Sequence, residues 1–372
     1  MELPAYIDPS LCFRTGASDS IQQNGFPVFK LIDSRLLKVK KLINEQLSTS
    51  APASTGVNLS PASACADKRG GTGIVNRLLE YLNTGSGKMI RPGLVLLAGS
   101  SVSKITDEHI LIAAIFEMIH NATLLHDDVI DDGQRRRGQP TINSLWGNES
   151  AVLLGDFLLS RALKMCAKLD SEVTKEIAVT AGRVCGGELR QVSESRNWQL
   201  SEMEYIDIIT EKSASVFSSC CYLGGLLSKG TETQLQSLRC FGLNAGIAFQ
   251  ITDDLLDIIG DERKTGKTLG SDVDKNKLTL PVIHLLKMID ERGKSEIIEK
   301  LNAKRGSTEL AEVYTLCPDF IEMLESYGSL EYARSRAKEF VEKAIAALAD
   351  LKESSAKNAL IETAKFLASR AV

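Results

Sequence analysis

Apolar positions recur at helical spacing along most of this 372-residue chain. Residues 26–47 show the first such stripe, in which apolar residues are interleaved with basic ones: Leu36, Leu37, Val39, Leu42, Ile43 and Leu47. From residue 74 to the C-terminus, apolar segments of about 15–25 residues are separated by short Gly, Ser or Asp breaks. Because alternating strand patterns with turn dipeptides are almost absent, the sequence predicts an all-α helix bundle.

Residues 48–73 interrupt this pattern with a small, polar stretch that contains Pro and Gly, and we expect a flexible loop there. We therefore divide the chain into an N-terminal extension over 1–73, with one helix and this loop, and a main domain over 74–372. The helix over 26–47 has an apolar face to bury, so we expect it to be continuous with the main domain as one fold.

Charge and composition exclude some classes of protein. The net charge is −4 and the pI is about 5.8, so bulk binding to nucleic acid is not expected. The eight cysteines include no C-x-x-C pair, and the N-terminus lacks a signal-peptide or transit-peptide pattern, which indicates reduced thiols in the cytoplasm. No apolar run approaches the roughly 18 residues of a membrane span, so we expect no transmembrane segment.

Two acidic clusters share the pattern D-D-x-x-D, and each directly follows a strongly apolar helical segment. Within a cluster, the first and last carboxylates are four residues apart and project from one helical face, where like charges repel each other. Such oxygen ligands suit Mg2+, which would relieve the repulsion. The alternative is two solvated acidic helix ends. The candidate metal ligands are Asp127, Asp128, Asp131, Asp253, Asp254 and Asp257.

Basic residues surround both clusters. Arg binds phosphate through a planar fork and Lys binds it as a point charge. Any one of them, taken alone, is more often a solvated surface residue, and their grouping around two acidic clusters is what indicates a diphosphate site. The residues concerned are Lys88, Arg91, Arg135, Arg136, Arg137, Lys212, Lys267 and Lys277.

Competing motifs fail at single positions. The sequence TGKT over 265–268 lacks the glycine that a P-loop needs at position 261, which is Asp261, and the lysine of GSGK is followed by Met89. Glu117 and His120 form half of a di-iron motif, but no other histidine has Glu three residues before it. No H-E-x-x-H motif or cysteine cluster indicates zinc.

Seven ordered segments, over roughly residues 74–370, together resemble the trans-isoprenyl diphosphate synthases, or (E)-polyprenyl diphosphate synthases. They are GKMIRP, EMIHNATLLHDDVIDDGQRRRGQPT, LLGDFLLSRAL, GGELRQ, EKSASVF, FQITDDLLDIIGD and TGKTLGSDVDKNKLTLPVIH. The resemblance implies the isoprenoid synthase fold, an antiparallel helix bundle around a central active-site cavity. It also implies a homodimer, and it makes 74–372 the catalytic domain.

The resemblance also implies roles for single residues. The six carboxylates would hold Mg2+, three ions per site, and the catalytic set would be Asp127, Asp131, Asp253 and Lys212. Isopentenyl diphosphate would be bound by Lys88, Arg91, His120 and Arg137. The allylic diphosphate would be bound by Arg136, Lys212, Ser213, Gln250, Lys267 and Lys277. Ser213 stands where the family often has Thr and keeps the hydroxyl, and Arg135 receives no role.

The implied reaction is a prenyl transfer. The allylic group ionises as its diphosphate departs, and the double bond of isopentenyl diphosphate attacks the resulting cation. A proton is then lost, in our interpretation to the released diphosphate, because no side chain is an obvious base. Water must be excluded from the cation.

The residues before the first cluster bear on product length. Ala122 and Thr123 are small, where short-chain relatives place an aromatic floor beneath the growing tail. Each further helical turn adds about 5.4 Å of depth, which brings Ile119 and then Phe116 beneath the site. We therefore expect a product of roughly hexaprenyl to nonaprenyl length, with Phe116 or its neighbours as the floor. Ordinary core packing of Phe116 is an equally open interpretation.

Three alternatives stay open on the sequence alone. The product could be shorter, of geranylgeranyl or farnesyl length. A class I terpene cyclase shares the first acidic cluster, but it does not need the second diphosphate site that Lys88 and Arg91 would form. A non-catalytic partner subunit of a hetero-oligomeric synthase belongs to another class of protein. Such subunits tend to lose the acidic motifs, and this chain keeps both.

Overall fold

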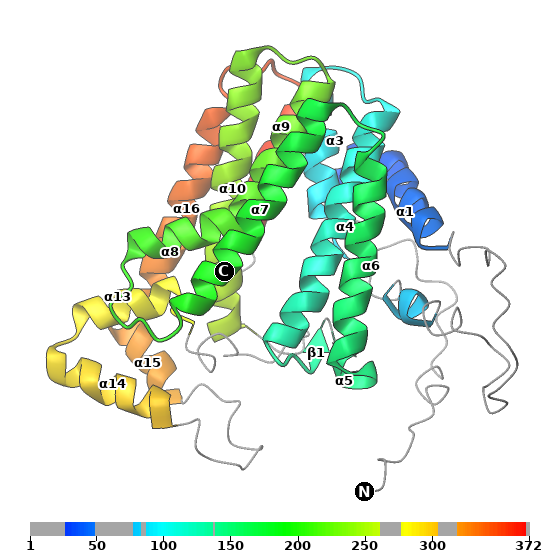
Figure 1. The fold of residues 1–372 in the computed structure, drawn as a ribbon. Coiled ribbons are helices and arrows are strands. Elements are labelled where there is room, and N and C mark those ends of the chain that lie inside the picture. The colour runs from blue at the N-terminus through cyan, green and yellow to red at the C-terminus, as the bar shows by residue number, and fades with distance from the viewer. Residues whose placement is uncertain are drawn as a thin grey trace, which may run out of the picture.

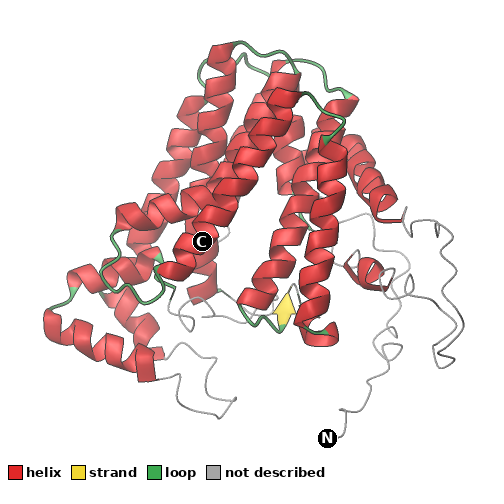
Figure 2. Cartoon of the chain, viewed as in Figure 1, coloured by secondary structure: helices red, strands yellow, loops and turns green. Residues whose placement is uncertain are grey.

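The computed structural model describes residues 27–48, 77–82, 87–136, 138–260, 277–303 and 318–369. Helices form nearly all of this part, as Figure 2 shows, which confirms the all-α prediction. The described strands are β1 (Arg135–Arg136) and β2 (Gln139–Pro140), an antiparallel pair in which Arg136 lies opposite Gln139. The predicted flexible loop over 48–73 lies, apart from Ser48, outside the described residues, and the division at residue 73 stays a prediction.

Long helices run side by side through the molecule (Figure 1). The helices that pack most extensively against one another are α3 (Ile90–Val102), α4 (Asp107–Ile130), α6 (Asn148–Cys166), α7 (Ser171–Ser193), α9 (Ser215–Leu227), α10 (Glu232–Ile259), α16 (Ser329–Ala347) and α17 (Ser355–Ser369). The smaller described elements are η2 (Pro27–Ile32), α1 (Asp33–Ser48), α5 (Ile142–Trp146), α8 (Glu202–Ile209), η3 (Thr210–Ala214), α13 (Leu280–Met288), α14 (Glu291–Ala303) and α15 (Pro318–Ser326).

Helix α3 is apolar on all sides, and this places it inside the bundle. It packs against α4, α9 and α17. The backbones of α3 and α9 approach closely at Gly224, where any side chain would collide with the carbonyl oxygen of Val95. Glycine therefore sets the spacing between two central helices.

The predicted amphipathic helix over 26–47 is present as η2 and α1, and α1 packs against α4. Val39, Ile43 and Leu47 are buried in the same hydrophobic core as the main bundle. Leu37 belongs to the predicted stripe, yet its side chain is 66% exposed because it falls on the opposite side of the helix. The N-terminal helix thus contributes to the single core of the described chain.

Helix α4 is, within the described ranges, the one helix long and apolar enough to cross a membrane. Of its most apolar 18-residue window, 61% is buried inside the bundle. The sequence pattern predicts no apolar segment of this length. The helix is this apolar because it packs against α1, α3, α6 and α9 together. The composition is that of a core helix.

Candidate active site

Both acidic clusters lie at the C-terminal ends of long helices, α4 and α10. Each helix begins at the other end of the bundle with a capping box, at Thr106 and Thr231 respectively. Figure 1 shows that both helices finish at the same, lower end of the molecule. Carboxylates at helix C-termini oppose the helix dipole, so two such clusters are unfavourable for the fold alone. Their position indicates a binding site.

The turn after α4 is held rigidly by hydrogen bonds. Asp132 adopts a left-handed conformation (φ 47°), and the backbone N–H of Gly133 then donates to the carbonyl oxygen of Asp128 at 2.8 Å. Asn143 donates through Nδ2 to the carbonyl oxygens of Asp128 and Gly133, both at 3.1 Å. The hydroxyl of Thr141 donates to the carbonyl oxygen of Gly133 as well, at 2.6 Å. The first cluster therefore sits on a fixed backbone.

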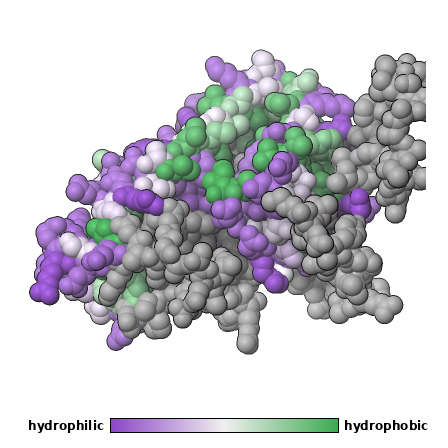
Figure 3. Space-filling model, turned by 60° about the horizontal axis from the view of Figure 1, so that its bottom comes forward, coloured by the Kyte–Doolittle hydropathy of each residue, from purple (hydrophilic) through white to green (hydrophobic). Residues whose placement is uncertain are grey.

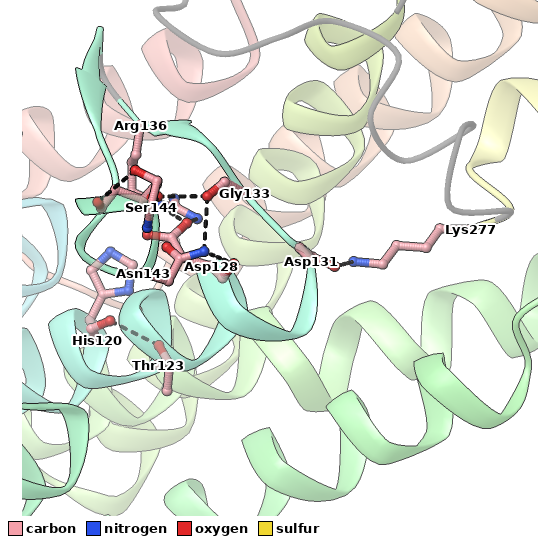
Figure 4. Close-up of polar contacts among 10 residues, drawn as sticks. His120, Thr123, Asp128, Asp131, Gly133, Arg136, Asn143, Ser144 and Lys277 are labelled. Carbon is pink, nitrogen blue, oxygen red and sulfur yellow. Dashed lines mark hydrogen bonds and ion pairs between the residues drawn. The ribbon is translucent and has the colours of Figure 1, made fainter. Parts of the chain in front are cut away.

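Asp128 pairs with Arg136. Its Oδ1 accepts from Nε and from Nη2 of Arg136, both at 2.8 Å, and its side chain is nearly buried (Figure 4). The structure thus brings two predicted site residues together, but as partners of each other. A carboxylate already engaged by a guanidinium group is less available to a metal than one without such an ion pair.

Lys277 connects the first cluster to the segment before α13. Its Nζ donates to Oδ1 of Asp131 at 2.8 Å, across 146 residues of sequence (Figure 4). Both side chains are largely buried, so the pair is screened less by water than a surface ion pair. This contact places a predicted diphosphate ligand directly beside a predicted metal ligand.

Lys212 lies on the π-helical segment η3, which joins α8 to α9. A π-turn inserts one residue and is frequent at functional sites. Nζ of Lys212 contacts Oε2 of Glu188 at 2.5 Å and donates to Oε1 of Gln191 at 2.7 Å, both on α7. Gly187 allows this approach, because a side chain there would collide with the backbone N of Lys212.

Glu188 and Gln191 were not predicted as site residues. The segment GGELRQ, which contains both, was part of the family resemblance, and this was the available signal. Asn143 and Tyr205 were not predicted either, and neither lies in a segment of the family resemblance; their contacts with the two clusters join residues far apart in sequence. Only tertiary placement brings these groups to the acidic ends of α4 and α10.

The second cluster resembles the first in having one buried carboxylate. Asp254 is buried, and its two oxygens accept from the hydroxyl of Tyr205 at 2.7 Å and from Nε2 of Gln250 at 2.8 Å. Oε1 of Gln250 accepts in turn from the hydroxyl of Ser213 at 2.7 Å. Asp253 and Asp257, one helical turn apart, are only half-buried.

Asp127 is the first carboxylate of the first cluster, and its side chain lies near Glu188 and Asp131. Burial above all, together with the neighbouring carboxylates of Glu188 and Asp131, raises the pKa of its carboxyl group to about 6, against the opposing effect of Lys212 and Arg136. A divalent cation would relieve this repulsion. The donors are all oxygen atoms, which fits Mg2+ and excludes a soft-metal site among these residues.

The described carboxylates of the two acidic clusters do not surround a common point. Within the described ranges, no three His, Cys, Asp or Glu side chains are close enough to form a metal cluster by themselves. A metal held by both acidic clusters would therefore need oxygen atoms of a bound diphosphate between them. This is the arrangement expected of Mg2+, which is usually bound through one or two carboxylates plus phosphate oxygens.

The structure describes three of the four residues predicted to bind isopentenyl diphosphate. Lys88 precedes α3, with Nζ 5.7 Å from the ring centre of Phe366, and Arg91 lies on α3 over Phe217, at 5.5 Å. His120 lies on α4, two turns before Asp128. The other predicted residues of the two diphosphate sites, Arg137 and Lys267, lie outside the described residues.

The sequence profile of the polyprenyl synthetase family matches residues 72–317, more than half of the chain. The chain belongs to this family. It is 36% identical over 298 residues to the octaprenyl diphosphate synthase of Escherichia coli K12, covering 80% of this chain and 90% of that protein. It is 35% identical over 299 residues to a short chain isoprenyl diphosphate synthase of Methanothermobacter thermautotrophicus, with coverages of 79% and 90%.

The fold of this polyprenyl synthetase matches solved structures of its relatives. The polyprenyl synthase of Caulobacter crescentus CB15, whose crystal structure contains calcium and isoprenyl diphosphate, superposes with a TM-score of 0.81 at 29% identity. The match covers 93% of this chain and 97% of that one. The protein is therefore an enzyme of prenyl transfer with the all-α isoprenoid synthase fold.

The four positions predicted to govern product length in this polyprenyl synthetase lie along α4. Ala122 and Phe116 are completely or almost completely buried, whereas Ile119 and Thr123 are half-buried. The hydroxyl of Thr123 donates to the carbonyl oxygen of His120 at 2.9 Å (Figure 4). Burial of Phe116 fits both interpretations, a floor of the cavity and ordinary core packing, so its role stays a prediction.

The raised pKa of Asp127 predicts how metal binding and stability depend on pH. An acid whose folded pKa lies above its ordinary value of 3.8 destabilises the fold once it ionises. Replacing Asp127 by Asn should therefore stabilise the metal-free protein by about 1–2 kcal/mol at pH 7.5, and not at pH 4. Mg2+ should lose its stabilising effect on the unmodified protein as the pH falls through about 6. Chemical denaturation across this pH range measures both effects.

The matched control is Asp132→Asn, the same change one residue beyond the cluster. Asn tolerates the left-handed backbone of Asp132, so its stability should follow that of the unmodified protein. Equal stabilisation by the two variants at pH 7.5 would contradict the inference that ionised Asp127 destabilises the metal-free fold.

Proposed function

We propose that this protein is a Mg2+-dependent trans-prenyltransferase that condenses isopentenyl diphosphate with an allylic diphosphate. The product would be an all-trans polyprenyl diphosphate of roughly hexaprenyl to nonaprenyl length. The observation that carries the proposal is the assembly at one end of the bundle. Two acidic clusters lie there, and cations from other elements, Arg136, Lys212 and Lys277, contact carboxylates in or beside the first.

The contacts suggest how these residues would change partners during substrate binding. Each cation is bound to a carboxylate, as in the pairs Lys277–Asp131 and Arg136–Asp128. Mg2+, when bound, would supply positive charge to Asp127, Asp131 and the allylic diphosphate. Lys277 and Lys212 would then turn from their carboxylate partners to phosphate oxygens. Fixed positive charge at the departing diphosphate stabilises the charge that develops in the transition state.

Apolar packing around the site would keep water from the allylic cation. Leu125 and Ala122 of α4 are buried within about one and a half turns before Asp127, and Phe217 and Phe249 lie with ring centres 5.3 Å apart. Phe217 also lies beneath Arg91, a predicted ligand of isopentenyl diphosphate. The released diphosphate is our proposed acceptor of the proton, and the cytoplasm our proposed location.

Product length is proposed from residues, because overall similarity does not decide it. The octaprenyl and the short-chain relative are almost equally identical to this chain, at 36% and 35%. Small residues at Ala122 and Thr123 favour a deep cavity and a longer product. A shorter, geranylgeranyl or farnesyl product is the alternative, and it would follow if Ile119 closed the cavity.

Assembly is also part of the proposal. Large apolar side chains are exposed on α6 and α7, and we call the surfaces that carry them the α6–α7 face: Val152, Leu153, Leu163, Val179, Leu189 and Val192. Figure 3 shows hydrophobic residues gathered on the visible side of the bundle, where α6 and α7 lie at the front in Figure 1. Exposed patches of this kind mark protein interfaces. We propose that a second copy of the chain covers it.

An activity assay tests the proposed reaction. Purified protein with Mg2+, isopentenyl diphosphate and one allylic primer at a time should form elongated products, which chromatography sizes. Removing Mg2+ with a chelator should abolish elongation. If the protein alone elongates no primer but does so with a second chain from the same source, it is the partner subunit of a hetero-oligomeric synthase.

Product size should respond to the residues beneath the first cluster. Ala122→Phe fills the cavity one turn before Asp127 and should shorten the product to about geranylgeranyl or farnesyl length, as measured by product chromatography. Phe116→Ala should lengthen it if Phe116 is the floor. Unchanged products from Ala122→Phe would show that the tail does not pass along this face of α4.

Sedimentation should detect the homodimer. We expect twice the 40.5 kDa chain mass for the unmodified protein, and a mass near 40.5 kDa after Leu153→Glu and Leu163→Glu together. The matched control is Leu37→Glu, which places the same charge at an exposed leucine of α1, outside the α6–α7 face. A monomer in the unmodified protein would contradict this part of the proposal.

A further inference from the structure

The second acidic cluster is supported by a chain of hydrogen bonds that begins at the buried Tyr205 on α8 and continues through the half-buried Gln250 and Ser213. The hydroxyl of Tyr205 donates to Asp254 at 2.7 Å, Nε2 of Gln250 donates to the same carboxylate at 2.8 Å, and the hydroxyl of Ser213 donates to Gln250 at 2.7 Å. Tyr205 is 3% exposed and Asp254 is 6% exposed. We call these four residues the Tyr205 chain. It joins α8, η3 and α10.

The buried position of Asp254 determines the directions in which the side chains of Asp253 and Asp257 leave α10. Successive residues of a helix point about a third of a turn apart, so a carboxylate anchored inside the protein fixes the rotation of α10 at this point. Asp253 and Asp257 then leave the helix on another side, one turn apart and half-buried. Hydrogen bonds to a buried carboxylate are charge-assisted and strong, which makes this anchor rigid.

The other end of the chain reaches Lys212. Ser213 is the next residue along η3, so its bond to Gln250 restrains the backbone that carries Lys212. This network therefore links the second acidic cluster to the backbone of Lys212, a cation that lies beside the first cluster. Removing the tyrosine hydroxyl would leave an oxygen of Asp254 without this donor, in a buried place where water cannot readily replace it.

We infer that Tyr205 is a positioning residue of the metal–diphosphate site. It acts through Asp254, which we assign to positioning and not to direct metal contact. This inference rests on the proposed Mg2+-dependent function. Groups that orient metal ligands in this way typically contribute about 10- to 100-fold to metal affinity.

Tyr205→Phe removes the hydroxyl and preserves the ring. Titration calorimetry with Mg2+ and inorganic pyrophosphate, without turnover, should show binding about 10- to 100-fold weaker than in the unmodified protein. The matched control is Tyr332→Phe on α16, which removes a hydroxyl that donates to Glu202. Glu202 lies on α8, like Tyr205, but it is not part of the Tyr205 chain. The control should lower the melting temperature about as much while leaving binding within twofold.

Binding within twofold of the unmodified protein in Tyr205→Phe, with only a lower melting temperature, would reduce Tyr205 to a structural role and overturn the inference. Absence of Mg2+-dependent pyrophosphate binding in the unmodified protein would instead overturn the proposed metal site, and the inference with it. The two failures are therefore distinguishable.

A second pair of variants decides the matter if Tyr205→Phe does not fold. Asp253→Asn and Asp254→Asn make the same change at adjacent positions of α10. If Asp254 positions and Asp253 binds, Asp254→Asn should retain at least about tenfold tighter binding of Mg2+ and pyrophosphate than Asp253→Asn. Equal losses would make Asp254 a direct ligand and overturn the inference.

Discussion

Repulsion among carboxylates at the lower ends of α4 and α10 is the constraint on which the site depends. The fold answers it locally: Arg136 engages Asp128, Lys277 engages Asp131, and Lys212 engages Glu188. These cations come from β1, from the segment before α13 and from η3. Neutralising the acidic charge therefore also holds three separate parts of the chain around the same place, while burial above all raises the pKa of Asp127 to about 6.

Much of this architecture could be predicted from the sequence. Periodicity predicts the bundle and the helix over 26–47, and the spacing of the acidic residues predicts which carboxylates share a helical face. Periodicity failed at Leu37, since a stripe in the sequence is wider than the buried face it contacts. The π-turn at η3 had no sequence signal, because it depends on how α7 and α10 pack around Lys212 and Ser213.

Site residues were predicted where a charge pattern or a family motif gave them a role, whereas Glu188, Gln191, Tyr205 and Asn143 were missed. Tyr205 and Asn143 look like ordinary helix and turn residues in sequence. Their roles arise from contacts across 49 and 15 positions, which no local pattern encodes. The sequence also could not distinguish the two carboxylates that the fold buries, Asp128 and Asp254, from their half-buried neighbours.

The pairing of Arg136, Lys212 and Lys277 with carboxylates has a consequence for selectivity in the cell. Nucleotides and sugar phosphates carry the same kind of anionic group as prenyl diphosphates and are abundant in cells. A pocket of unpaired cations would attract all of them, whereas cations already bound to Asp128, Glu188 and Asp131 do not. An anion that arrives without the metal must compete with these carboxylates, so we expect the metal-free protein to bind free phosphate esters weakly.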